Sequence, residues 1–236
     1  MLIICEARNV LFPMGSRYAF AESVFLLCSS LKHHFASSEK SPETNMCNLY
    51  RMTATVDEMR DLFGSFTGDR TNLEPRDEIY PDQTAPVVRA EDGGLTLEEM
   101  MWGIPGWSEK QRPITNVRNL KSGFWKPMLS NPQAKVLVPV SQFCEWTGQK
   151  GAKRKVWFKM KNEPLFAFAG LCRRTPDGMR YAFLTTEPNA LVAPVHPKAM
   201  PVIIAKSHYE NWLSSDYENA VKLAKPYDAD AMAIAE

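Results

Sequence analysis

Short apolar runs with turn-forming residues between them constrain the fold of this chain most strongly. In its second half, segments of six or seven residues that contain β-branched or aromatic residues succeed one another: Lys135–Val140, Gln142–Thr147, Lys155–Lys161, Leu165–Leu171 and Arg180–Thr185. This length and composition predict β-strands. Because no helical pattern alternates with them, we expect an α+β fold, a single domain rich in short antiparallel strands with a few helices.

Weaker patterns add elements before and after these runs. Extended segments are expected at Ile79–Arg89, Leu95–Trp102 and Pro201–Ala205. Helices are expected within Thr53–Phe66, at Phe124–Leu129 and after Ser207. In the first helix, Thr55 precedes Glu58 by three positions, which is the pattern of a capping box. Ser207 is the expected N-cap of the last helix.

The first 45 residues differ in character from the rest of the chain. Charged residues interrupt their apolar positions, unlike a secretory signal, and the polar segment Ser37–Asn45 is typical of a linker. We therefore divide the chain into an N-terminal extension, residues 1–45, and a patterned domain, residues 46–236. Met46 is followed by the small residue Cys47, which permits removal of an initiator methionine. We expect the mature protein to lack the extension; an extension that stays attached is the alternative.

Charge and cysteine spacing exclude several protein classes. The formal net charge is only +1, so a nucleic-acid contact requires a local basic groove. The five cysteines are irregularly spaced, which argues against a zinc knuckle or a thioredoxin-like motif and favours free thiols in a reducing cytoplasm. No apolar run is long enough to span a membrane, and we expect no membrane association.

Four polar residues stand in neighbourhoods that suit covalent chemistry: Cys47, Asn116, Glu145 and His196. A thiol nucleophile requires an acid or base partner, and both require groups that orient them. Each residue also has an ordinary structural explanation: a buried thiol, a turn asparagine, a solvent-facing strand glutamate and a loop histidine. From the residues alone, the chain is a candidate thiol enzyme.

Aromatic and basic residues are also interleaved. The rings Trp102, Trp107, Phe124, Trp125 and Trp146 lie close in sequence to Lys110, Arg112, Arg118, Lys121 and Lys126. This mixture suits single-stranded nucleic acid, because rings stack on bases while cations follow phosphates. A tryptophan-rich hydrophobic core is the competing explanation.

Motifs in a fixed order resemble those of the SOS-response-associated peptidase (SRAP) family. They are Met46-Cys47-Asn48-Leu49-Tyr50, Tyr80-Pro81 with Ala85-Pro86-Val87-Val88, Met101-Trp102-Gly103-Ile104-Pro105-Gly106-Trp107, Asn116-Val117-Arg118, Val138-Pro139 with Phe143-Cys144-Glu145-Trp146, Phe168-Ala169-Gly170-Leu171, Leu184-Thr185-Thr186-Glu187-Pro188-Asn189, and His196-Pro197-Lys198-Ala199-Met200-Pro201-Val202. The resemblance spans Met46 to about Leu213 and leaves the extension outside.

The resemblance implies a barrel-like sheet core and an enzyme that bonds covalently to abasic sites in single-stranded DNA. Such a protein shields the lesion during replication or the DNA damage response, acts at the nucleoid as a monomer, and requires no metal or cofactor. By resemblance, Cys47 forms the crosslink, Asn116 and Glu145 line its pocket, and His196 acts on the sugar. The expected DNA contacts are Arg51, Trp102, Arg118 and Trp146.

Two features depart from the commoner family pattern. Asn48-Leu49 comes after the cysteine where many members have Gly-Arg, so Arg51 is the expected substitute cation. The block from His196 to Pro201 is one residue longer than the commoner spacing, which affects the geometry of its loop.

An N-terminal cysteine suits this reaction because its amine and thiol lie at the spacing of a thiazolidine ring. The amine condenses with the aldehyde of an opened abasic sugar, and the thiol closes on the imine carbon in an intramolecular step. Two alternatives remain. One is a thiol peptidase, including an autoproteolytic one that removes only its own leader, with the hydrolase, protease and lyase activities that family terms suggest. The other is a single-stranded DNA-binding module without chemistry.

Overall fold

Five strands close into a barrel in the computed structural model, which describes residues 47–67, 73–91, 93–108, 110–149 and 151–235. The strands are β3 (Thr84–Glu91), β4 (Gly94–Trp102), β6 (Lys135–Val140), β9 (Phe166–Thr175) and β10 (Gly178–Thr186). Each pairs with the next in the order β10-β4-β3-β6-β9, and β9 pairs back to β10. Only the β4–β10 pair of this ring is parallel. The expected barrel-like sheet core is confirmed.

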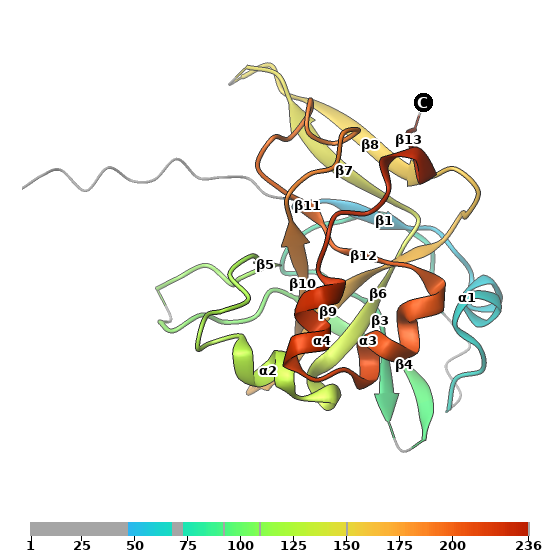
Figure 1. Cartoon of the computed structure of the whole chain (residues 1–236), viewed down its shortest axis with the longest axis vertical. Helices are drawn as coiled ribbons and strands as arrows, with labels where there is room; N and C mark the ends of the chain where they lie inside the picture. Colours follow the sequence, from blue (N-terminus) through green and yellow to red (C-terminus); the bar gives the residue numbers. More distant parts are fainter. Residues whose placement is uncertain (1–46, 68–72, 92, 109, 150, 236) are drawn as a thin grey trace, which may run out of the picture. The chain divides into compact units, whose positions relative to one another are not determined.

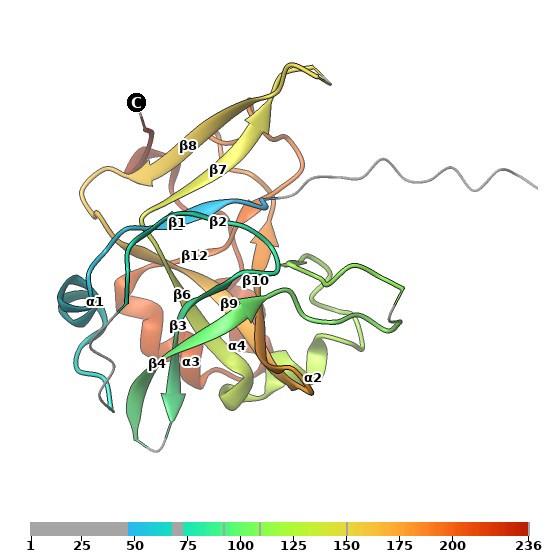
Figure 2. The ribbon, with the colours of Figure 1, turned by 180° about the vertical axis from the view of Figure 1, so that it is seen from behind.

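A second sheet lies at one end of the barrel (Figures 1 and 2). It has the order β13-β8-β7-β1-β2, and every neighbouring pair is antiparallel. Its strands are β1 (Tyr50–Met52), β2 (Arg76–Ile79), β7 (Gln142–Thr147), β8 (Arg154–Met160) and β13 (Met232–Ile234).

Aromatic side chains join the two sheets. Tyr50 of the second sheet packs edge-on against Trp102 of the barrel, with ring centroids 5.3 Å apart. Phe143 packs in the same way against Phe168 at 5.7 Å. All four side chains are fully buried, so their apolar area stabilises the junction between the sheets.

Three very short strands attach to the barrel beside the candidate residues. β5 (Asn116–Val117) pairs in parallel with β10, while β11 (Met200–Pro201) and β12 (Ile203–Ile204) pair with β10 and β9. The loop between β10 and β11 contains His196. The expected strand at Pro201–Ala205 is thus two strands separated by Val202.

Helices cover the barrel and its edges. They are α1 (Val56–Phe63), α2 (Lys126–Ser130), α3 (Tyr209–Ser214) and α4 (Tyr217–Leu223), with 3-10 turns η1 (Pro132–Ala134), η2 (Lys206–His208) and η3 (Ala229–Ala231). The capping box of α1 is confirmed: Glu58 N donates to Thr55 Oγ1 at 3.3 Å, and Thr55 N donates to Glu58 Oε2 at 2.7 Å.

The N-cap expected at Ser207 is wrong. Residues 206–208 form the turn η2, and α3 begins after His208, whose side chain makes no capping hydrogen bond. Within the described part of the chain, no helix combines the length and apolar character needed to cross a membrane.

Candidate active site

The four candidate residues come from four segments that meet where the second sheet joins the barrel. Cys47 precedes β1, Asn116 opens β5, Glu145 lies in β7, and His196 lies in the loop before β11. The Asn116 Nδ2 donates a hydrogen bond of 2.9 Å to the Cys47 carbonyl oxygen. Glu145 Oε2 lies 3.8 Å from His196 Nδ1, and the charge of Glu145 acts on the Cys47 thiol. The structure therefore brings all four together.

Strand alternation points Glu145 into the molecule. Phe143 and Glu145 share the inner face of β7, and Glu145 is only 1% exposed, so the solvent-facing alternative does not hold. Burial raises the pKa of this carboxyl group well above its usual range, because the charged form loses hydration. Its Oε1 atom is buried and receives no hydrogen bond from any residue that the structure describes. Burial therefore favours the protonated form of Glu145 and leaves one of its oxygens open to a donor.

In the side-chain amide of Asn116, the nitrogen is hydrogen-bonded to described residues and the oxygen is not. Its Nδ2 donates to the Cys47 carbonyl and to Thr115 Oγ1, both at 2.9 Å. Its Oδ1 is buried and has no partner among the described residues. A buried acceptor without a partner costs about 1–3 kcal/mol, so such an atom is normally occupied when a ligand binds.

The Cys47 thiol is buried and uncharged. Its residue is 2% exposed, and Sγ lies 3.7 Å from the carbonyl oxygens of Leu49 and Cys144. Burial raises the pKa of the thiol well above its usual value, and Glu145 raises it further when its carboxyl is ionised. Cys47 is therefore held as a thiol rather than as a thiolate.

A backbone carbonyl orients His196. The Nδ1 atom lies 2.7 Å from the carbonyl oxygen of Ala199, and because a carbonyl only accepts, Nδ1 carries the proton. In the neutral ring, Nε2 is then the basic nitrogen. The 3.8 Å distance from Glu145 Oε2 to His196 Nδ1 is too long for a hydrogen bond.

The predicted DNA contacts have different positions. Arg118 is exposed, one residue beyond β5, and Trp146 is half-buried on the outer face of the second sheet. Arg51 lies on β1 with its guanidinium 3.7 Å above the Trp157 ring, and it donates to Gln142 Oε1 and to the Asp77 carbonyl, both at 3.2 Å.

The stacking role predicted for Trp102 does not fit its position. Its side chain is fully buried between the sheets, and Nε1 donates to the Thr115 carbonyl at 3.1 Å. Neither ring face is open to a base. The exposed ring of this motif is instead Trp107, which is 76% exposed and packs edge-on against Phe124 at 4.8 Å.

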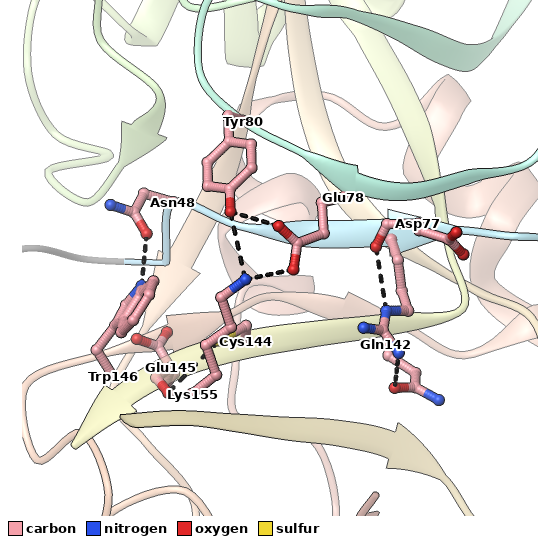
Figure 3. Close-up of polar contacts among 10 residues, drawn as sticks. Asn48, Asp77, Glu78, Tyr80, Gln142, Cys144, Glu145, Trp146 and Lys155 are labelled. Carbon is pink, nitrogen blue, oxygen red and sulfur yellow. Dashed lines mark hydrogen bonds and ion pairs between the residues drawn. The ribbon is translucent and has the colours of Figure 1, made fainter. Parts of the chain in front are cut away.

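Sequence reasoning missed the residues that orient the site. Asn48 accepts a hydrogen bond from Trp146 Nε1 at 3.1 Å (Figure 3), Thr115 holds Asn116, and the Ala199 carbonyl holds His196. Their only sequence signal is adjacency to a candidate residue or to its motif. Within the described residues, no group of three histidine, cysteine or acidic side chains lies close enough to hold a metal ion.

Comparisons with known proteins agree with this architecture. Residues 46–236 match the family described as SOS response associated peptidase (SRAP). A crystal structure of a protein from Bacteroides thetaiotaomicron has a TM-score of 0.67 at 20% identity, covering 80% of this chain and 92% of its own. Two from Bordetella bronchiseptica, one described as a phage-related protein, have TM-scores of 0.66 and 0.65 at 19% identity; each covers 80% of this chain, and 98% and 93% of its own. A search of curated protein sequences returned no match.

Proposed function

This chain belongs to the SOS response associated peptidase family, which associates it with the response to DNA damage, and on that basis we propose that it captures abasic sites in single-stranded DNA covalently through Cys47. One observation carries the proposal beyond the family. Two buried acceptors beside Cys47, Asn116 Oδ1 and Glu145 Oε1, have no partner among residues 47–235 as far as the structure describes them. A freed amine at Cys47 and the hydroxyl groups of an opened sugar supply the donors that these atoms lack.

The reaction balances with the loss of one water molecule. The amine of an N-terminal Cys47 adds to the aldehyde carbon, and the resulting hydroxyl leaves as water to give an imine. The thiol then adds across the C=N bond: sulfur bonds to carbon, its proton goes to nitrogen, and a five-membered thiazolidine closes. Both nucleophiles belong to one residue, so ring closure is intramolecular and favourable.

Glu145 and His196 carry out the proton transfers of the proposed reaction. The carboxyl group of Glu145 can protonate the departing hydroxyl, recover a proton from the nitrogen as the imine forms, and relay the thiol proton to that nitrogen as the ring closes. His196 assists opening of the sugar ring. Its Nδ1 donates to the Ala199 carbonyl oxygen, so Nε2 of the neutral imidazole is the nitrogen that can accept a proton. Asn116 fixes the carbonyl of Cys47 and so the position of both nucleophiles.

The state of the thiol favours this chemistry over a thiol peptidase. A cysteine peptidase requires a thiolate, whose pKa is lowered by a neighbouring cation. Burial and Glu145 shift the pKa of Cys47 in the opposite direction. A thiol that adds to an imine gives up its proton within the step, so a neutral thiol is suitable. The proposed DNA contacts are Arg118, Trp146 and Arg51.

The test is a denaturing gel shift with a single-stranded oligonucleotide that carries one abasic site. The protein begins at Met46, with that methionine removed, and is compared with Cys47→Ala. Wild type should give a band that survives heating in detergent. Cys47→Ala keeps the α-amine, so it should give a band only after reduction of the imine with borohydride.

Each outcome separates the candidate functions. An undiminished heat-stable band from Cys47→Ala would remove the thiazolidine from the mechanism. No covalent band from wild type, with or without borohydride, would leave only a DNA-binding module. Cleavage of unrelated peptides by wild type and not by Cys47→Ala would support the peptidase.

A further inference from the structure

Positive charge is concentrated in the hairpin that joins β7 to β8. Between Trp146 and Asn162 the sequence has no acidic residue and six cations: Lys150, Lys153, Arg154, Lys155, Lys159 and Lys161. The whole chain has a formal net charge of only +1. The hairpin is therefore a local source of positive potential on an otherwise balanced molecule.

At the turn end of the hairpin, two cations have no side-chain partner among the residues that the structure describes. Lys155 is paired with Glu78 and lies near the Tyr80 hydroxyl (Figure 3). Lys153 and Arg154 are exposed, and in the part of the chain that the structure describes no hydrogen bond or ion pair involves either side chain. Their charges are thus available to an external anion.

The hairpin starts at the candidate site. Strand β7 carries Glu145 and Trp146 and runs directly into it, and in the ladder Trp146 pairs with Lys155 and Thr147 with Arg154. At about 3.3 Å per residue, Arg154 lies roughly 7 Å farther along the strand than Glu145. Figures 1 and 2 both show this end of β7 and β8 extending beyond the remaining strands of the sheet.

Glycine gives the hairpin a defined turn. Gly148 has a φ of +104°, and a Cβ atom there would lie 2.7 Å from the Ala152 carbonyl oxygen. Ala152 N donates to the Gln149 carbonyl at 3.0 Å, which closes the turn. Lys153 therefore follows a closed turn, and Arg154 opens the paired strand β8 directly after it.

We propose that Lys153 and Arg154 bind the phosphate backbone of the single-stranded DNA that flanks the abasic site on one side. The proposal rests on the proposed function, because it takes the site at Cys47 as the point where the lesion sits. Phosphate contacts of this kind carry no sequence information, but they fix the direction in which the strand leaves the site.

The first test measures noncovalent binding of intact single-stranded DNA to the full chain over a range of salt concentrations. Lys153→Ala/Arg154→Ala is compared with Lys222→Ala/Lys225→Ala, which removes two exposed lysines near α4, away from the hairpin (Figure 1). For single strands, each phosphate contact contributes about 0.7 to the slope of log K against log salt concentration. The slope for the hairpin variant should therefore be about 1.4 smaller than for wild type, and its affinity at low salt roughly tenfold weaker. The α4 variant should bind as wild type does.

The second test locates the contact relative to the lesion. Short oligonucleotides carry one tetrahydrofuran residue, an abasic analogue without an aldehyde, and are extended only on the 5′ side or only on the 3′ side. Wild type should gain affinity from one extension more than from the other, and the hairpin variant should lose that difference.

These outcomes decide the two proposals separately. Equal slopes and affinities for the hairpin variant and wild type would overturn the hairpin contact, as would equal losses in both double variants. A loss shared equally by the 5′ and 3′ extensions would also overturn it. No preference for the tetrahydrofuran residue would count against the proposed function, while the salt slopes would still decide the hairpin.

Discussion

The carboxyl group of Glu145 is buried, and one of its oxygens has no hydrogen-bond partner among the described residues. Burial raises the pKa of Glu145 in the folded state above its value in the unfolded chain. The folded protein then binds the proton more tightly, so this residue's favourable contribution is complete below the unfolded pKa, about 4.5. The contribution is lost as the pH rises toward the folded pKa.

Glu145→Gln should therefore stabilise the protein at alkaline pH and change little at pH 4. The amide keeps the shape of the carboxyl and does not ionise, so the difference in melting temperature should grow from pH 4 to pH 8, by about 2–4 °C for each kcal/mol. Circular dichroism measures it. Crosslinking by the variant should fall by about 10²–10⁴-fold if Glu145 transfers protons.

Glu58 supplies a control with the opposite sign. Hydrogen bonds from Thr55 lower the pKa of Glu58, so its contribution is present above the unfolded pKa and is lost as the pH falls. Glu58→Gln should not become more stable than wild type between pH 4 and pH 8. A Glu145→Gln variant that shows the same pattern as Glu58→Gln would contradict the burial argument.

The orientation of the Trp146 ring depends on the side chain of Asn48, which lies just before β1. Asn48 Oδ1 accepts the indole N–H at 3.1 Å, and Lys155 Nζ lies 5.7 Å from the ring centroid. Asn48→Ala removes the acceptor, which is worth about 0.5–1.5 kcal/mol, and should weaken binding of single-stranded DNA about two- to tenfold. Fluorescence anisotropy of a labelled oligonucleotide measures this loss.

A double-mutant cycle tests whether the loss passes through Trp146. Trp146→Phe keeps an aromatic face and removes the N–H, so Asn48→Ala should have no further effect in that background. Asn48→Asp keeps an acceptor oxygen and should restore most of the affinity. If Asn48→Ala weakens binding equally in both backgrounds, Asn48 acts independently of the tryptophan.

At the level of single residues, the sequence predicted which residues meet but not how each is presented. Cys47, Asn116, Glu145 and His196 do lie together, as the family motifs implied. Trp102 belongs to an equally recognisable motif, yet its ring is fully buried. The difference arises from packing between the two sheets, which no local pattern encodes.

Among the elements, those with strong local patterns were predicted best. The bounds of β6 and β7 are as expected, and α1 begins after the expected cap at Thr55. Each has its own signal: a run of buried β-branched residues, an alternation, or a capping box.

The elements that sequence analysis missed depend on partners far along the chain. β1 has three residues and is held by pairing with β7, from Tyr50 to Phe143, while β13 pairs with β8, from Met232 to Met160. Closure of the barrel requires the parallel pairing of β4 with β10, which brings Trp102 beside Tyr181. Strand periodicity gives the face of each residue and not the identity of the neighbouring strand.

The molecule as a whole combines a match to its family over residues 46–236 with 45 residues that lie outside it. The relation between these parts determines whether the proposed chemistry is possible. In the full chain, the nitrogen of Cys47 is joined to Met46 by a peptide bond. An amide nitrogen is not basic and forms no imine, whereas a free α-amine has a pKa of about 8 and is partly neutral at physiological pH.

We therefore predict that the intact chain does not crosslink abasic single-stranded DNA, and that a chain beginning at Met46 does so once its methionine is removed. Asn116 holds Cys47 through its carbonyl oxygen and not through its nitrogen, so we expect the contact to persist when the preceding residues are removed. Intact mass establishes each N-terminus, and a denaturing gel tracks the adduct over time. The matched control is the short chain with Met46 retained, which differs by one residue and should be as inactive as the full chain. If the intact chain, confirmed by mass, crosslinks as fast as the chain that begins at Cys47, the free amine is not the nucleophile and the thiazolidine mechanism is wrong.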